Sequence, residues 1–253
     1  MNLIWADWPA PACVKAVTTT RTGGVSEAPY NQLNLGDHVG DDPFSVAMNR
    51  QRLLTHLNLQ QPAQWLKQVH GTQVIEAKSD SIVREADALF SRAKGVACVI
   101  MTADCLPVFF TNHDGSQVAA AHAGWRGLVS GVLEATVATF EQSNTLYAWL
   151  GPAIGPEAFE VGQEVYDAFV ADMPEAETAF KVSPSHSDRW LADIYQLARL
   201  RLQRAGVTAI YGGDFCTFSD AGRFYSYRRE AVTGRMASLI WIEQSPLGSV
   251  KPR

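Results

Sequence analysis

Two apolar segments set the architecture of this chain: Val96-Ala-Cys-Val-Ile-Met-Thr-Ala-Asp-Cys105 and Gln117-Val-Ala-Ala-Ala-His-Ala-Gly-Trp-Arg-Gly127. Both are nearly continuous in apolar residues, as are strands of a sheet that is covered on both faces. They predict strands over 96–102 and 117–121. Each apolar run breaks at a side chain that can bind a metal or act in catalysis, namely Cys105 and His122.

Further strands and helices alternate on either side of this centre. β-rich runs predict strands over 13–20, 64–69, 74–77, 107–111, 146–150 and 237–243. Helical spacing of apolar residues predicts helices over 45–57, 127–140, 162–171 and 188–205. The alternation indicates an α+β (mixed α/β) fold in which helices cover sheet layers. We find no repeat and no low-complexity linker, so we expect a single domain over 1–253.

Composition narrows the possible functions. Hydrophobic residues make up 47% and charged residues 19% of the 253 residues, enough for a sizeable core without staples. The net charge of −5 argues against a general nucleic-acid surface. The chain shows no secretory signal and no apolar run long enough to cross a bilayer, so we expect a cytoplasmic protein without a membrane partner. The four cysteines are widely spaced, which favours thiols over disulfides.

The segment from His122 to Gly127 has the most specific pattern. An imidazole ends a strand, two glycines allow a tight turn, and a helix is expected to begin at once. Free N–H groups at a helix start attract anions, and Arg126 can add charge-assisted hydrogen bonds. The alternative is an ordinary strand-to-helix turn with an incidental histidine and a surface arginine, which we consider less favoured.

Three side chains form a possible metal site: His70, Cys105 and His122. His70 ends the strand-like run 64–70, and Cys105 follows a buried strand with Asp104 beside it. Two histidines and one cysteine are the protein ligands of one type of catalytic zinc site, which leaves a fourth position open. Copper also suits these ligands. The same Cys105 and His122 equally suit a nucleophile and its base, and a buried structural cysteine is a third reading.

Two further segments carry arginines near turns. Arg21 lies in Thr18-Thr-Thr-Arg-Thr-Gly-Gly-Val-Ser26, where successive backbone N–H groups can form an anion nest. Arg228 and Arg229 follow aromatic residues in Phe224-Tyr-Ser-Tyr-Arg-Arg229 and can hold an anion or stack on a planar group. Surface turns and a solvated charged edge explain these patterns equally well.

Taken together, these motifs resemble the laccase-domain family, also called multicopper polyphenol oxidoreductase proteins. The resemblance runs in order from about Thr18 to Arg235. Its main motifs are Thr19-Thr-Arg-x-Gly-Gly-x-Ser26, Gln68-Val-His-Gly71, Thr102-Ala-Asp-Cys-Leu-Pro107, Ala121-His-Ala-Gly-Trp-Arg-Gly127, Gly151-Pro-x-Ile-Gly155 and Ser226-Tyr-Arg-Arg229. It implies a single-domain αββα sandwich and a metal held by His70, Cys105 and His122, either Zn²⁺ or Cu²⁺.

The resemblance also implies an activity on purine nucleosides. Family members are described as phosphorylases of adenosine, inosine and methylthioadenosine, with adenosine deamination as a further activity. We therefore expect a nucleoside and phosphate as small-molecule partners, and a monomer or small homo-oligomer. For this chemistry, Arg21, Arg126, Arg228 and Arg229 are the candidates for phosphate. Asp104 is the candidate acid and base for deamination, beside Cys105 and His122.

Three other functions remain to be weighed. Laccase chemistry needs a trinuclear copper cluster plus a further copper, and this chain has six histidines and no His-x-His pair. We therefore discount a copper polyphenol oxidase. A cysteine hydrolase or amidase would use Cys105 as nucleophile and His122 as base. It would fit the link of bacterial relatives to peptidoglycan precursor editing. A non-catalytic binding module would bind such ligands without turnover.

Overall fold

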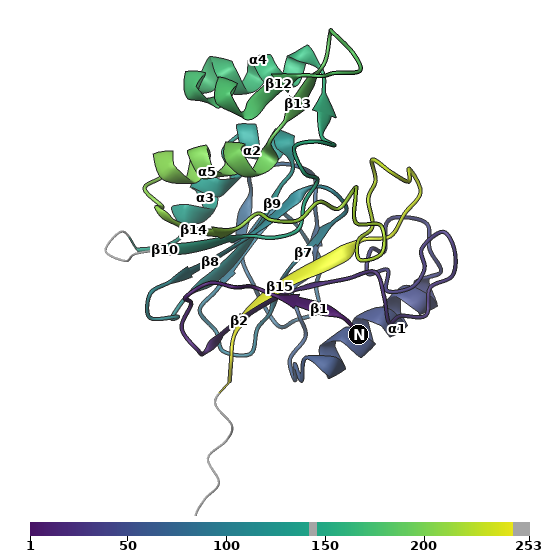
Figure 1. Ribbon diagram of the computed structural model, residues 1–253. Coiled ribbons are helices and arrows are strands. Elements are labelled where there is room, and N and C mark those ends of the chain that lie inside the picture. The colour runs from purple at the N-terminus through teal and green to yellow at the C-terminus, as the bar shows by residue number, and fades with distance from the viewer. Residues whose placement is uncertain (142–145, 245–253) are drawn as a thin grey trace, which may run out of the picture.

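Two β-sheets packed face to face form the centre of the protein (Figure 1). The computed structural model describes residues 1–141 and 146–244. The smaller sheet has the order β1-β2-β15-β7, formed by Leu3–Trp5, Val14–Thr19, Met236–Ile242 and Cys98–Thr102. The larger sheet has the order β14-β10-β8-β9-β6-β4, formed by Ala209–Gly212, Leu146–Leu150, Leu106–Asn112, Val118–Ala123, Ala88–Ser91 and Val74–Glu76.

The apolar runs of the sequence supply both faces of these sheets. In β7, Cys98 and Ile100 pack between the two sheets, whereas Val99 and Met101 pack on the outer face of the smaller sheet. Every residue of β7, β8 and β9 is buried. Since side chains alternate between the faces of a strand, burial of both faces requires a continuous apolar run.

Helices cover the outer face of each sheet. Helix α1 (Pro43–His56) begins after the N-cap Asp42 and packs Leu53 on the smaller sheet. Helices α2 (Trp125–Val129), α3 (Val132–Val137) and α5 (Ile194–Arg204) lie over the larger sheet in one apolar cluster with its strands (Figure 1). The layer order is α, β, β, α, as the family resemblance predicted.

A small unit stands above α2 and α5 (Figure 1). It combines a three-stranded sheet of order β11-β13-β12 with helix α4 (Gln163–Asp172) and the short helix η1 (Pro174–Ala179). Its strands are Glu160–Val161, Trp190–Ala192 and Phe180–Val182. A separate two-stranded parallel sheet joins β3 (Leu66–Lys67) to β5 (Arg84–Glu85).

Three element predictions need correction. The helix expected over 127–140 is two short helices, because Gly131 adopts a φ of 95° that only glycine takes without strain. The helix expected over 188–205 begins as strand β13, and α5 starts after Asp193, whose side chain caps Gln196 N–H. The strand expected over 64–69 reduces to the two residues of β3 and an isolated bridge between Gln64 and Cys98. Short elements of this kind hold too few residues for a period to show.

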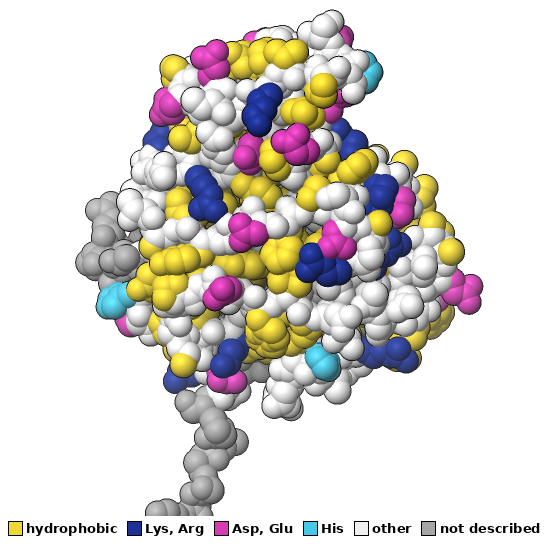
Figure 2. Space-filling model, viewed as in Figure 1, with side chains coloured by type: hydrophobic (Ala, Val, Ile, Leu, Met, Phe, Trp, Pro, Cys, Tyr) yellow, Lys and Arg dark blue, Asp and Glu magenta, His cyan; other side chains and the backbone are white. Residues whose placement is uncertain are grey.

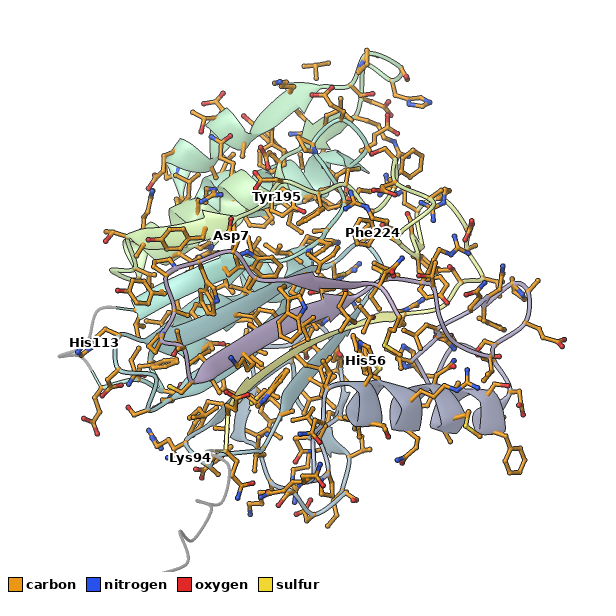
Figure 3. The ribbon with its side chains drawn as sticks, turned by 60° about the horizontal axis from the view of Figure 1, so that its bottom comes forward. Asp7, His56, Lys94, His113, Tyr195 and Phe224 are labelled. Atoms are coloured by element: carbon orange, nitrogen blue, oxygen red, sulfur yellow. The ribbon has the colours of Figure 1, made fainter. Side chains whose placement is uncertain are left out.

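The surface and the helices add two observations. On the face seen in Figure 2, acidic and basic side chains are interspersed rather than gathered into a basic stripe. Among the helices of the described residues, none is long and apolar enough to cross a membrane. His56 at the end of α1 and His113 in a turn lie far apart on the molecule (Figure 3).

Candidate metal centre and active site

His70, Cys105 and His122 meet at one end of the sandwich. Their possible ligand atoms all lie within 4.8 Å of one another, and Cys105 Sγ is 3.8 Å from His70 Nε2. Cys105 lies where the chain crosses from β7 in the smaller sheet to β8 in the larger one. The β8–β9 register places Pro107 opposite His122, so the thiol and the imidazole are neighbours.

A buried carboxylate, Asp87, orients His122. The β6–β9 register pairs Ala88 with Ala121, which brings Asp87 opposite His122. The Asp87 side chain is fully buried, and its Oδ1 lies 2.8 Å from His122 Nδ1. This contact leaves His122 Nε2 as the ring nitrogen that faces Cys105. A carboxylate on the outer nitrogen of a metal-binding histidine fixes the tautomer and the ring orientation.

The same carboxylate holds the loop that carries His70. The backbone N–H groups of Val69, His70 and Gly71 donate to Asp87 at 3.1, 2.9 and 2.6 Å. His70 has a φ of 61°, the left-handed conformation in which successive N–H groups converge on one anion. Asp87 therefore positions two of the three possible ligands.

The charges of Cys105, His122 and Asp87 stabilise one another. Burial raises the pKa of the Cys105 thiol, but the positive His122 and hydrogen bonds to both histidines outweigh it and lower this pKa to about 6. Burial lowers the pKa of His122, whereas the Cys105 thiolate and the Asp87 carboxylate raise it to about 9. The protein thus favours a thiolate beside an imidazolium at neutral pH, which is the form of cysteine that binds metal.

The group fits a zinc-sized ion. A tetrahedral zinc with its usual bond lengths separates its sulfur and nitrogen ligands by about 3.3–3.6 Å. The observed 3.8 Å between Cys105 and His70 is close to that spacing. Gly124 leaves space beside the ligands, because a Cβ at this position would lie 2.9 Å from His70 Cδ2 and 3.0 Å from Cys105 Sγ. Two imidazoles and one thiolate suit zinc or copper and leave further positions open.

Two cavities adjoin this group. The first has a volume of about 140 Å³ and is mainly apolar, with Trp125, Ile154, Phe159 and Ile194 in its wall. The second has a volume of about 330 Å³ and is the more polar of the two, with His70, Cys105 and His122 in its wall. The second volume lies at the lower end of the ~300–1,000 Å³ that is typical of small-molecule sites, and the first is smaller.

The apolar cavity depends on α5 for part of its wall. Tyr195, labelled in Figure 3, follows Ile194 on α5. Its hydroxyl accepts a hydrogen bond from Ala153 N–H at 2.8 Å and donates to Phe215 O at 2.9 Å. These bonds tie α5 to the loop after β10, and so hold Ile154 and Ile194 together at the cavity.

Two of the four predicted phosphate-binding arginines are occupied by backbone carbonyls. Arg21 donates to Asn31 O and Ala221 O. Arg229 donates from Nη1 and Nη2 to three carbonyls within 217–224 at 2.7–2.8 Å. Both guanidinium groups hold loops together, and neither lines the two cavities beside the metal-binding group.

The other two arginines differ in position. Arg228 lines the apolar cavity, and its Nη1 donates to Glu160 O at 2.8 Å. Arg126 is exposed and lies over the ring of Trp125, at 4.4 Å from the ring centroid. Of the four, the structure places Arg228 in the same cavity wall as Cys105.

Asp104 lies beside Cys105 and links three segments. Its Oδ1 accepts a hydrogen bond from Thr217 Oγ1 at 2.6 Å. Its Oδ2 accepts from Ser226 Oγ at 3.0 Å and from the backbone N–H of Arg228 at 2.7 Å. The carboxylate thereby holds the loop that carries Arg228 against the end of β7.

Comparison with known protein families gives one match over most of the chain. A family model described as multi-copper polyphenol oxidoreductase laccase matches residues 15–243. The chain belongs to this family. The match covers the strands from β2 onward, the metal-binding group and both cavities, in agreement with the resemblance of the sequence motifs.

Several named proteins are similar to this member of the laccase-like family. A Pseudomonas aeruginosa protein named purine nucleoside phosphorylase is 59% identical over 238 residues, which cover 94% of this chain and 97% of that one. The Escherichia coli protein named purine nucleoside phosphorylase YfiH is 53% identical over 243 residues, which cover 95% and 99%. Both relatives are named as enzymes that act on purine nucleosides.

Solved structures share the fold of this family member. A crystal structure of Neisseria meningitidis protein NMB0706 matches with a TM-score of 0.91 at 50% identity, and covers 96% of this chain and all of the other. The crystal structure of YlmD from Geobacillus stearothermophilus matches with a TM-score of 0.87 at 31% identity, and covers 95% and 96%.

The sequence motifs of the family did not single out all of the residues at this site. Asp87 stands between two alanines in the run Ala86-Asp-Ala-Leu-Phe90, and a lone charge within such an apolar run is the signal that was missed. Arg235 and His38, which line the polar cavity, lie within sequence segments that match the family but received no predicted role. Their positions follow from loops that fold back to the site.

Proposed function

We propose that this protein is a metal-dependent purine nucleoside phosphorylase that cleaves adenosine, inosine and S-methyl-5′-thioadenosine, with adenosine deaminase activity. The observation that carries the proposal is an open three-ligand centre between one apolar and one polar cavity. A purine is planar and largely apolar, whereas ribose and phosphate are polar. The names of the relatives support purine nucleosides as the substrate class.

In this proposal His70, Cys105 and His122 hold the metal, which we take to be zinc, with copper as the alternative. When bound, the metal supplies a Lewis acid that activates water for deamination. Asp87 keeps His122 in the tautomer that presents Nε2. Cys105 is already in the thiolate form that binds a cation at neutral pH, and His122 releases its proton when the metal binds.

The residues around the centre have separate roles. Among the arginines, we assign Arg228 to substrate because it lines the apolar cavity. We give Arg21 and Arg229 the role of holding loops, since they donate to carbonyls and line neither cavity. Arg126 is exposed and would bind phosphate only at the rim. Asp104 stays our candidate for the carboxylate of deamination, and it would exchange one of its present hydrogen bonds to act.

The direct test uses purified protein and adenosine, with and without inorganic phosphate. The expected products are adenine and hypoxanthine in the presence of phosphate, and inosine alone in its absence, because cleavage of inosine also consumes phosphate. Cys105→Ala is expected to abolish both reactions if they share the metal. Absence of any phosphate-dependent base release from metal-loaded wild-type protein would refute the phosphorylase.

One observation favours a second function. The Cys105 thiolate and the His122 imidazolium also form the pair that a cysteine hydrolase or amidase of peptidoglycan precursors needs. That enzyme would work without metal and would be trapped by an alkylating agent during turnover. Elemental analysis of protein purified without added metal separates the two, since the phosphorylase should retain zinc or copper.

The proposed enzyme needs free thiols and small soluble substrates. The described cysteines are all free, which suits the reducing cytoplasm. We therefore place the enzyme there, as a monomer or small homo-oligomer.

A further inference from the structure

The two cavities beside the metal-binding group adjoin each other. They share Ala103, Cys105 and Tyr227 in their walls, so the thiol lies at their junction. A ligand that reaches into both cavities must therefore pass beside Cys105. In the phosphorolysis of a nucleoside, the bond between C1′ of the ribose and the base breaks. This bond lies in the middle of the bound substrates, between the base and the incoming phosphate.

The apolar cavity suits the purine. Trp125, Ile154, Phe159 and Ile194 give it flat aromatic and aliphatic walls. Arg228 is its cationic donor, and its Nε and Nη2 have no hydrogen-bond partner within the described residues. A planar apolar ring with acceptor nitrogens at its edge satisfies such a pocket, because the walls cover the faces and the guanidinium meets the edge.

The polar cavity is built for an anion. Thr102 is 2% exposed and lines this cavity, and its hydroxyl has no hydrogen-bond partner within the described residues. A buried hydroxyl without a partner costs free energy. The Thr102 oxygen is shielded from solvent, so a phosphate oxygen would accept its hydrogen bond after a small rotation of the side chain. His38 and Arg235 line the same cavity.

Arg235 is held in place with donors to spare. Its Nη1 donates to Thr233 O and Gly234 O, while Nε and Nη2 have no partner within the described residues. Gly36 makes room for its side chain, because a Cβ at Gly36 would lie 2.8 Å from Arg235 Cγ. A fixed guanidinium with free N–H groups is suited to a phosphate or carboxylate.

We infer that the site divides its substrates between the cavities: Arg228 meets the purine in the apolar cavity, and Arg235 with Thr102 holds phosphate in the polar cavity. This inference rests on the proposed phosphorylase and assigns its phosphate to residues outside the four arginines expected from the sequence. It also places C1′ of the ribose beside Cys105, at the junction.

The assignment accounts for the charges in the reaction. A phosphate oxygen forms a bond to C1′ as the bond from C1′ to the purine N9 breaks. The electron pair of that bond moves onto the purine, and the proton of hydrogen phosphate ends on the released base. Arg235 neutralises the attacking dianion, and a donor from Arg228 to a purine ring nitrogen stabilises the charge that develops on the leaving base.

The test compares two matched variants with inosine and phosphate varied separately. Arg235→Gln is expected to raise the KM for phosphate about 10- to 100-fold, the loss typical of a hydrogen bond to a charged group, with the KM for inosine nearly unchanged. Arg228→Gln is expected to lower kcat by a similar factor without changing the KM for phosphate. Arg223→Gln, an exposed arginine of the same C-terminal region, is the control and keeps wild-type kinetics.

Thr102→Val is nearly isosteric and provides a second test of phosphate binding, which remains informative if an arginine variant fails to fold. It is expected to raise the KM for phosphate several-fold, with metal content and melting temperature like those of the wild type. The inference is overturned if Arg235→Gln and Thr102→Val both leave the KM for phosphate unchanged, or raise the KM for inosine instead. Wild-type protein that releases no base with phosphate would refute the proposed function itself, and the division of substrates with it.

Discussion

One buried side chain, Asp87, connects most of the metal-binding group. Its Oδ1 forms a hydrogen bond with Nδ1 of His122, and the carboxylate accepts hydrogen bonds from three backbone N–H groups around His70. Burial raises the pKa of Asp87, but the hydrogen bonds from His122 and the backbone outweigh this and keep the pKa below its ordinary value. The carboxylate is therefore charged when the histidines bind metal. Its loss should disturb both of them together.

Asp87→Asn tests this role. The amide keeps the shape but loses the charge, and its NH₂ group faces N–H donors. We expect metal affinity to fall by about 10- to 100-fold, as for other partners behind metal-binding histidines. Competition with a chelator of known affinity measures it. Glu85→Gln is the matched control, because Glu85 is exposed and pairs with Lys67. Equal affinities for both variants would contradict the role of Asp87.

The thiol of Cys105 gives a prediction about pH. In metal-free protein its pKa lies near 6 rather than 9, because His122 stabilises the thiolate. A lowered pKa means that thiolate is abundant above pH 6 and lost as the pH falls through it. Alkylation by iodoacetamide should therefore be half-maximal near pH 6, as followed by mass spectrometry. Zinc should protect the thiol. A midpoint above pH 8 for Cys105 would count against the ion pair.

At the scale of the elements, the junction between β9 and α2 decides the room for the metal. Gly124 has φ −64° and ψ 157°, a conformation open to any residue, so its importance is steric. A Cβ at this position would crowd His70 and Cys105. We expect Gly124→Ala to weaken metal binding while the protein stays folded. Metal titration and thermal unfolding measure the two effects.

Gly131, between α2 and α3, is needed for its backbone conformation rather than for space near the metal-binding group. Its φ of 95° is left-handed, so Gly131→Ala strains the backbone and should lower the free energy of unfolding by about 1–2 kcal/mol. The Cβ would meet Glu134 and lies away from the metal-binding group, so metal affinity should not change. Weaker metal binding in Gly131→Ala, or normal binding in Gly124→Ala, would contradict the steric explanation.

In the whole molecule, the metal-binding group joins three distant parts of the chain. His70 follows β3, Cys105 lies in the connection from β7 to β8, and His122 is on β9. A ligand that binds only the folded state stabilises it by about 2.7 kcal/mol at 100 times its Kd. For a protein of this size, that raises Tm by about 5–10 °C. Thermal unfolding with excess zinc should show this rise, and Cys105→Ala should lack it. An unchanged Tm in the wild type would exclude zinc binding at the folded site.

Much of the fold was predictable because its central strands are long and buried. Strands β7 and β9, and helices α1 and α4, lie close to where the apolar patterns predicted them. The short strands β11, β12 and β13 were missed, since two or three residues hold no period. The break at Gly131 was missed as well, because the sequence does not reveal which glycine adopts a left-handed conformation.

The sequence by itself determined the chemistry that is available: three metal-binding side chains at the ends of apolar runs, and an ordered set of family motifs. Tertiary structure alone decided which arginine does what. Arg21 and Arg229 are taken up by carbonyls from other loops, whereas Arg235 reaches the polar cavity. The physical reason is that periodicity reports how a residue is buried within its own element. Which distant carbonyl or carboxylate it meets depends on sheet register and on loops that fold back, as with Asp87 opposite His122.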